Sequence, residues 1–301
     1  MQENTKGYFG DLMLLLVAII WGFGFVAVKI GLNNGMDPFY LMFLRFSVAA
    51  LALLPFQITK FKGISLQTLK RGSFLGILLF LGFTFQTIGL DYTTTSKNAF
   101  LTGVNVIIVP FLTWWLAKKK VDFYSMIAAF MCLIGIGLLT LHDSLSINIG
   151  DLLTLICAVM FAAHITITSL IAKEEAASTL VWIQMIVGAV LSFIFAILFK
   201  ETFVINLSSS VAILYLGIFS TSLAFFLQTV GQKYAHATKA AILLSTESLF
   251  GALLAVLFFK DTFALQMIAG CVLIFGSIII SETKLSFIKR KPQEITSIPF
   301  E

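Results

Sequence analysis

Charged side chains are scarce in this chain. They make up 12% of its 301 residues, whereas soluble domains carry about 25%. Apolar side chains account for 59% of the chain. So little charge excludes a soluble enzyme, because the polar surface would not cover a water-exposed fold. The composition predicts a protein that crosses a lipid bilayer many times.

Cysteine and the motifs of nucleotide chemistry are also rare or missing. The three cysteines fall in three different apolar segments without metal-ligand spacing, so we expect neither a disulfide framework nor a metal site. No GxxxxGK[ST] loop for ATP occurs, which argues against ATP-driven transport by this chain. No nucleophile is paired with a base either. We therefore expect no enzymatic activity and no cofactor.

Ten apolar segments run through the chain. Most are about 20 residues long, which suits a hydrocarbon core of about 30 Å. They are continuously apolar rather than alternating, which excludes the strands of a membrane barrel. The fold class predicted is an all-α membrane protein with ten transmembrane helices. The segments are 11–31, 38–56, 72–90, 98–116, 123–141, 151–171, 179–199, 210–231, 240–259 and 264–281.

The second half of the chain repeats the first. The stretch Gly10–Ala18 aligns with Gly150–Ala158 at a shift of 140, and Gln86–Ala99 aligns with Gln228–Ala241 at a shift of 142. Each half holds five segments, an odd number, so the second half must enter the membrane in the opposite orientation. Secondary transporters are commonly built from such inverted repeats. We expect a first five-helix repeat, an inverted second repeat and a basic tail, at residues 10–141, 150–282 and 283–301.

Positive charge is divided unevenly between the two sides of the predicted bundle. With the N-terminus inside, 15 Lys and Arg residues lie on the cytoplasmic side and 4 on the outer side, while Arg45 lies within a segment. The positive-inside rule then places both termini in the cytoplasm of a cell-membrane protein. The KRK run at 289–291 suits anionic lipid headgroups rather than a nucleic acid.

Glycine and proline mark two details of packing. Gly72 and Gly76 form a GxxxG pattern, which allows close approach of another helix. That helix could belong to the same monomer, which we favour, or to a second copy in a homodimer. Pro110 lies inside the segment 98–116 and is expected to kink it.

Several stretches resemble the EamA family of the drug/metabolite transporter superfamily. They are WGFGFVAVK at 21–29, DPFYLMFLRF at 37–46, YTTTSKNAFLTGVNVIIVPFLTWWLAKKK at 92–120, QKYAHATKAAILLSTESLFGALLAVLFFKDTF at 232–263 and GCVLIFG at 270–276. The resemblance implies a ten-helix transporter with a central cavity between its halves, often an exporter of metabolites or amino acids. The family often has Glu-Pro where this chain has Glu247-Ser248, and Gly-Glu where it has Lys260-Asp261.

Glu247 is the strongest candidate for a functional side chain. It lies near the centre of the segment 240–259, where a charged residue costs roughly 2.5–3.5 kcal/mol on insertion scales. It should therefore face a cavity or a polar partner. We predict that Glu247 contacts substrate and exchanges the coupling proton, the alternative being a structural carboxyl bonded to a neighbouring helix. Its repeat partner is Asn105.

Polar residues on two other segments support a central site. Asn98, Thr102 and Asn105 follow each other at helical spacing and form one polar stripe. His164 shares a helix face with Phe161. For each of these residues, lining a cavity and bracing neighbouring helices are the two alternatives.

The remaining candidates are aromatic or amide side chains. Trp21 and Phe25 would stack on a ligand or pack in the bundle. Gln86 and Gln228 are repeat partners that can both donate and accept hydrogen bonds. For Arg45 we favour a structural ion pair or a headgroup contact. The predicted substrate-binding residues are Trp21, Phe25, Gln86, Asn98, Thr102, Asn105, Phe161, His164, Gln228 and Glu247.

Together these features predict a secondary transporter of small metabolites such as amino acids. We expect an exporter that works by alternating access, with the two inverted halves rocking around the site. The expected partners are a small-molecule substrate, the bilayer and a proton, with no nucleic acid. Two alternatives are a flippase for lipid-linked substrates, which needs a basic lateral pocket, and a membrane scaffold or sensor, which normally carries a soluble output domain.

Overall fold

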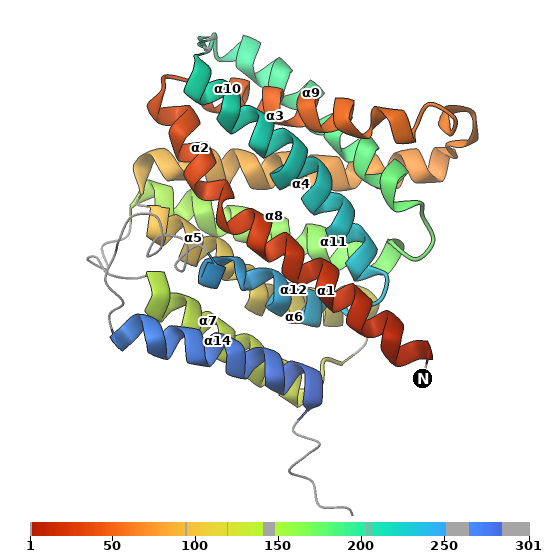
Figure 1. Cartoon of the computed structure of the whole chain (residues 1–301), viewed down its shortest axis with the longest axis vertical. Coiled ribbons are helices and arrows are strands. Elements are labelled where there is room, and N and C mark those ends of the chain that lie inside the picture. Colours follow the sequence, from red (N-terminus) through yellow and green to blue (C-terminus); the bar gives the residue numbers. More distant parts are fainter. Residues whose placement is uncertain are drawn as a thin grey trace, which may run out of the picture.

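The computed structural model describes residues 2–93, 95–118, 120–140, 148–202, 204, 206–250 and 265–284. Within these ranges the regular structure is entirely helical, as predicted, and contains no strand (Figure 1). The first half contains α1 Gln2–Gly22, α2 Gly24–Asn33, α3 Pro38–Leu53, α4 Leu66–Tyr92, α5 Thr95–Gly103, α6 Asn105–Ala117 and α7 Phe123–Thr140. The second contains α8 Ile149–Ile171, α9 Ala177–Leu198, α10 Leu207–Leu214, η3 Tyr215–Leu223, α11 Ala224–Gln232, α12 Ala237–Ser245 and α14 Leu265–Thr283.

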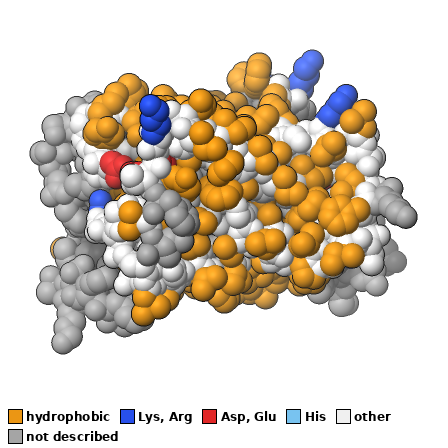
Figure 2. Space-filling model, turned by 90° about the horizontal axis from the view of Figure 1, so that it is seen from above, with side chains coloured by type: hydrophobic (Ala, Val, Ile, Leu, Met, Phe, Trp, Pro, Cys, Tyr) orange, Lys and Arg blue, Asp and Glu red, His pale blue; other side chains and the backbone are white. Residues whose placement is uncertain are grey.

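The described helices have the length and hydrophobicity of a multi-pass membrane protein. Seven helical stretches are long and apolar enough to cross a bilayer, and two shorter apolar helices cover Phe123–Leu138 and Ile268–Ser281. The expected segment 240–259 is described only as far as residue 250, so the count of ten helices stays a prediction. Figure 2 shows one face covered by hydrophobic side chains, with its few charged side chains toward the two ends.

Helices from the two halves of the chain interleave. The most extensive packing pairs α4 with α8 and α9, α3 with α9, α7 with α14, and α1 with α11. Each pair joins a helix of the first half to one of the second, and α7 and α14 lie side by side at one end of the long axis (Figure 1). The most extensive packing therefore crosses between the halves, and the expected rocking of the two halves stays a prediction.

Two glycine contacts related by the repeat hold the halves together. A Cβ placed on Gly10 of α1 would lie 2.9 Å from the carbonyl oxygen of Gly231 on α11. A Cβ on Gly150 of α8 would lie 2.6 Å from the carbonyl oxygen of Gly89 on α4. Gly10 aligns with Gly150, and Gly89 aligns with Gly231. The two contacts are therefore equivalent under the repeat, and each joins the two halves of the chain.

A polar contact lies near each of these glycine contacts between helices. Beside the first, Lys239 forms an ion pair with Asp11 at 2.8 Å. Beside the second, Thr93 donates a hydrogen bond to Asp151 at 2.6 Å. Because Asp11 and Asp151 are repeat partners, the same Gly-Asp pair takes part in a polar contact in both places.

The GxxxG pattern packs within the monomer. A Cβ on Gly72 would lie 2.8 Å from the Cβ of Ile183, and one on Gly76 would lie 2.8 Å from the Cβ of Val187. Both partners belong to α9. The close approach allowed by these glycines is therefore used between α4 and α9 of one chain.

Adding a methyl group at a glycine crossing should destabilise the bundle. We expect Gly150→Ala to lower the free energy of unfolding by about 1–3 kcal/mol, since its Cβ meets backbone that cannot rotate away. Gly7→Ala on α1 is the control, because nothing lies within 4 Å of that Cβ. Thermal unfolding of the two purified variants measures the difference. Equal midpoints would show that the crossing tolerates a shift of the helices.

Two helices are interrupted at repeat-related positions. Between α5 and α6 the helical pattern stops at Val104, and after α12 it stops at Thr246 and resumes at Glu247. Val104 and Thr246 align at the shift of 142. The break in the first half lies before Pro110, which sits within α6, so the helical pattern is interrupted at Val104 and not at the proline. Both interruptions directly precede a polar side chain predicted to bind substrate.

Candidate functional site

A cavity opens among the helices where the two halves meet. It encloses about 810 Å³ of space, counting its opening, and is lined by residues of α1, α2, α3, α4, α5, α6, α8, η3, α11 and α12 together with Glu247. Apolar side chains form most of its wall, and a few polar groups converge on it, as in other small-molecule sites.

Much of the cavity wall consists of repeat-related pairs. The aromatic pairs are Trp21 with Phe161 and Phe83 with Phe225. Their rings pack closely: Trp21 lies 5.2 Å from Phe225, and Phe83 lies 5.2 Å from Phe161, measured between centroids. The aromatic wall is therefore continuous across both halves of the chain.

The polar wall follows the same symmetry. Gln86 and Gln228 both line the cavity, as do Asn105 and Glu247. Gln86 donates a hydrogen bond to Thr102 at 3.2 Å, and Gln228 donates one to Gln232 at 3.1 Å. The paired positions that we predicted from the sequence repeat thus lie around one cavity.

Several acceptor oxygens at this wall have no hydrogen-bond partner among the described residues. They are Oδ1 of Asn105, Oε1 of Gln228 and Oγ of Ser245, all on residues less than 10% exposed. Buried polar atoms are normally satisfied by protein or by ordered water. These three oxygens can accept hydrogen bonds from a bound molecule.

Glu247 also lines the cavity and forms no hydrogen bond or ion pair with the described part of the chain. It directly follows the helix interruption at Thr246. Its carboxyl is therefore an acidic group of the site, at the position that aligns with Asn105 in the repeat.

His164 and Trp21 are held in place by neighbouring helices. The Nε2 atom of His164 lies 2.8 Å from Oε1 of Gln184 on α9. Because the amide nitrogen of Gln184 donates to the carbonyl oxygen of Leu180, its oxygen accepts from the imidazole. The indole nitrogen of Trp21 donates to the carbonyl oxygen of Ser220 at 2.8 Å, inside the π-helical stretch η3. Both rings thus have fixed orientations at the cavity wall.

One predicted residue does not line the cavity, and the side chain of another is not described. Asn98 is absent from the cavity lining and instead donates to the carbonyl oxygen of Gln86 and to Thr154, at 3.1 and 2.9 Å. The stripe that we predicted along α5 and α6 therefore contributes Thr102 and Asn105 only. The side chain of Phe25 lies outside the described part of the chain.

The structure also adds cavity residues that we did not predict. Phe83 and Phe225 precede Gln86 and Gln228 by the same three residues, so the repeated motif could have been extended to include them. Arg45 of α3 lines the cavity as well and is 2% exposed. The ion pair that we favoured for Arg45 is not formed with any described residue.

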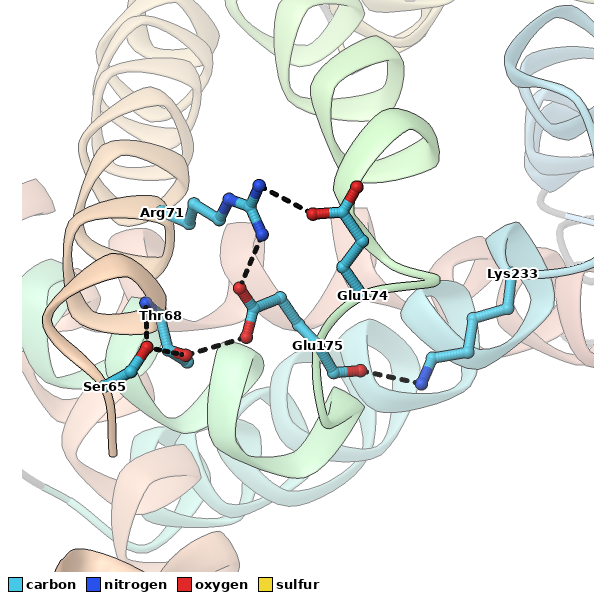
Figure 3. A network of polar contacts seen from close by, with 6 residues as sticks. All are labelled: Ser65, Thr68, Arg71, Glu174, Glu175 and Lys233. Atoms are coloured by element: carbon cyan, nitrogen blue, oxygen red, sulfur yellow. Dashed lines mark hydrogen bonds and ion pairs between the residues drawn. The ribbon is translucent and has the colours of Figure 1, made fainter. Parts of the chain in front are cut away.

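A polar network joins helices at the end of the bundle where α4 begins (Figure 3). Arg71 of α4 pairs with Glu174 at 2.7 Å and with Glu175 at 2.8 Å, both in the connection between α8 and α9. Thr68 donates a further hydrogen bond to Glu175 at 2.8 Å. Lys233, just after α11, donates to the backbone oxygen of Glu175 at 2.8 Å. The network thus ties three elements together at this end.

Next to Lys233 in the chain, Gln232 bridges α11 and α8. Its amide nitrogen donates to the carbonyl oxygen of Ile165 and to Ser169, both at 2.8 Å. Gln232 is fully buried. Through its bond with Gln228, Gln232 therefore connects a cavity-lining side chain to α8.

An apolar helical bundle with a cavity where its two repeats meet is typical of a multi-pass membrane transporter. The model of the EamA-like transporter family matches the chain twice, over residues 8–141 and 148–283. The chain therefore belongs to the EamA-like transporter family.

Relatives along the whole chain agree with this assignment. An uncharacterized transporter of Archaeoglobus fulgidus is 34% identical, with 92% of this chain and 87% of that protein covered. The uncharacterized inner membrane transporter YicL of Salmonella typhimurium is 29% identical, with 90% and 94% covered. A solved crystal structure has the same fold, with a TM-score of 0.80 and 17% identity over 93% of this chain and 99% of that one.

Proposed function

We propose that this protein is a secondary transporter that moves small metabolites through the central cavity by alternating access. The observation that carries the proposal is the construction of the cavity from repeat-related residues of both halves. A site at the interface of inverted repeats can be opened to either side by equivalent motions. Helices of the two halves pack against one another. In this proposal each moving group therefore contains helices from both halves of the sequence.

The helix interruptions support a binding role for their neighbours. In many transporters the substrate and coupling ions bind where membrane helices are discontinuous near the midplane. Here the breaks at Val104 and Thr246 place Asn105 and Glu247 beside backbone that is not fully helical. Both side chains line the cavity.

We propose proton coupling through Glu247 and export from the cell. A carboxyl that faces the cavity without a protein partner can bind a proton from one side and release it to the other. The distribution of 15 against 4 positive residues supports a cell-membrane protein with both termini in the cytoplasm. The direction of export rests on the resemblance of the motifs to exporters of the family.

Substitution of Asn105 tests the cavity as the substrate site. We expect Asn105→Leu to weaken ligand binding at least tenfold, since it removes one unsatisfied acceptor and adds apolar bulk at the cavity wall. The ligand is first found by a thermal-shift screen of metabolites, and its affinity is then measured by calorimetry. Phe111→Leu on the same helix is the control, because Phe111 is 48% exposed on the outside of the bundle.

Uptake into proteoliposomes that contain only this protein separates transport from other roles. Wild type is expected to move the ligand, and Asn105→Leu to move it much more slowly while remaining monodisperse. Full affinity and rate in Asn105→Leu would remove this cavity as the transport site.

A further inference from the structure

The charged groups of the cavity depart from its symmetry. Gln86 and Gln228 match across the repeat, but Arg45 has no polar counterpart, since residues 185–187 at the corresponding positions are Met, Ile and Val. Arg45 is also the single Arg or Lys among the described cavity-lining residues. A bound molecule therefore meets positive charge on one wall only.

The guanidinium of Arg45 has hydrogen-bonding capacity to spare. Its Nε and Nη2 atoms both donate to the same hydroxyl oxygen, Oγ1 of Thr221, at 3.0 and 2.9 Å. Nη1 has no acceptor among the described residues. A guanidinium offers five N–H donors in a planar fork that matches a carboxylate, and a single hydroxyl cannot satisfy them.

The surroundings of Arg45 position its guanidinium group without neutralising its positive charge. Its guanidinium carbon lies 4.0 Å from the centroid of the Phe83 ring, which also lines the cavity. No carboxylate of the described chain lies within ion-pair distance. A purely structural cation at this depth would be expected to have an acidic partner from the protein. A positioned but unneutralised cation beside a cavity is suited to an anion that enters from outside.

Glu247 does not serve as that partner. It belongs to the wall formed with α12 and α6, whereas Arg45 lies on α3, which packs against α9 and η3. In Figure 1, α3 lies toward one end of the long axis, and α6 and α12 lie below α1 and α8. The unsatisfied acceptors of Asn105 and Ser245 lie on the Glu247 side, on α6 and α12. Arg45 and Glu247 thus belong to different helices of the cavity wall, and no ion pair joins them.

We propose that Arg45 binds the carboxylate of the transported molecule, and that this molecule is a small carboxylic acid with an apolar body and a hydrogen-bond donor. The aromatic pairs contact the apolar body, and the unsatisfied oxygens accept from the donor group, such as a hydroxyl or ammonium. The proposal rests on the proposed function of the cavity and names the class of substrate and the residue that selects it.

Pairs of probes that differ only at the carboxyl test this proposal. L-phenylalanine, L-leucine, phenyllactate and phenylacetate are each compared with the corresponding primary amide, by calorimetry on the purified wild-type protein. We expect at least one acid of the set to bind at least tenfold more tightly than its amide. If no acid binds better than its amide, the proposal is wrong.

Variants of Arg45 link the preference to this side chain. Arg45→Gln should reduce binding of the preferred acid at least tenfold, to the level of its amide, and leave the amide unchanged. Arg45→Lys keeps the charge without the fork and should fall between the two. Lys60→Gln, which removes an exposed cation from the connection between α3 and α4, should bind like wild type. If the preferred acid binds Arg45→Gln as tightly as wild type, the proposal is wrong. If Arg45→Gln does not fold, the same comparison is made with Arg45→Lys, and unchanged affinity for the acid again overturns the proposal.

Failure of this inference differs from failure of the proposed function. Binding is measured in detergent and does not require transport, so an acid that binds through Arg45 but is not moved in proteoliposomes contradicts the transport function alone. A protein that moves the amides as fast as the acids contradicts the role of Arg45 and leaves the transport function intact.

Discussion

Replacing Glu247 with glutamine is expected to abolish accumulation of substrate driven by a pH gradient while leaving exchange of substrate across the membrane. Glutamine has nearly the shape of the protonated carboxyl, so the cavity wall keeps its volume and its acceptor oxygen. It cannot release a proton, so the cycle loses its driving force. The expected result is a loss of nearly all gradient-driven accumulation, with an exchange rate within a few-fold of wild type.

The surroundings of Glu247 explain why its substitution should affect gradient-driven accumulation but not exchange. The carboxyl lines the cavity and forms no hydrogen bond or ion pair with the described residues, so its removal breaks no structural contact there. Two other titratable groups, Arg45 and His164, line the same cavity from α3 and α8. The thiol of Cys157 lies behind Thr102, at 3.9 Å from its hydroxyl.

The measurement uses proteoliposomes with an imposed pH gradient and, separately, with equal pH and substrate on both sides. Glu174→Gln is the matched control, because Glu174 is a carboxylate whose side chain is 59% exposed at one end of the bundle. Accumulation by Glu247→Gln equal to wild type would assign Glu247 a structural role. Coupling would then have to be sought at His164 or in another ion.

The repeat in the sequence predicted the symmetric part of the site. Gln86 and Gln228, and likewise Asn105 and Glu247, are aligned positions, and a site on the symmetry axis must collect such positions from both halves. Their spacing along the chain therefore indicated that they would meet. Asn98 shares the stripe of Asn105 in sequence, but it faces α4 and α8, where it donates hydrogen bonds.

The asymmetric part of the site could not be predicted in this way. Arg45 has no aligned polar partner, and a lone arginine in an apolar segment is equally compatible with an ion pair, a headgroup contact or a ligand. Its role depends on which face of α3 meets η3 and on the absence of a described acidic neighbour. Neither property follows from the residues of α3 alone.

The arrangement of helices shows a similar limit. The sequence predicted helical segments, because apolar runs of this length have few alternatives in a bilayer. It did not predict that α4 would pack on α8 and α9, since a repeat specifies symmetry but not which helices are neighbours. The glycines Gly10 and Gly150 are contact points between helices, but the sequence does not show that their partners are Gly231 and Gly89.

Removing Arg71 is expected to destabilise the protein more than removing either of its acidic partners. The side chain of Glu175 is 8% exposed and accepts bonds from Arg71 and Thr68, so Arg71→Gln leaves a nearly buried carboxylate without its cation. Breaking a buried pair from one side costs about 3–5 kcal/mol, and the 25% exposure of the Arg71 side chain places the expected cost near the lower limit. Glu174→Gln should cost about 0–1 kcal/mol, as is usual for exposed pairs.

A double-mutant cycle tests whether the charge of Glu175, rather than the bulk of Arg71, causes this loss. Thermal and denaturant unfolding are measured for wild type, Arg71→Gln, Glu175→Gln and the combined variant in the same detergent. In the combined variant no buried charge is left unpaired, so we expect it to recover at least half of the stability lost in Arg71→Gln. If the two losses simply add, Arg71 and Glu175 are not coupled, and the network in Figure 3 contributes through packing alone. Coupling of at least 1 kcal/mol is expected for groups that share one network, and it would show that the charge pair stabilises the packing at this end of the bundle.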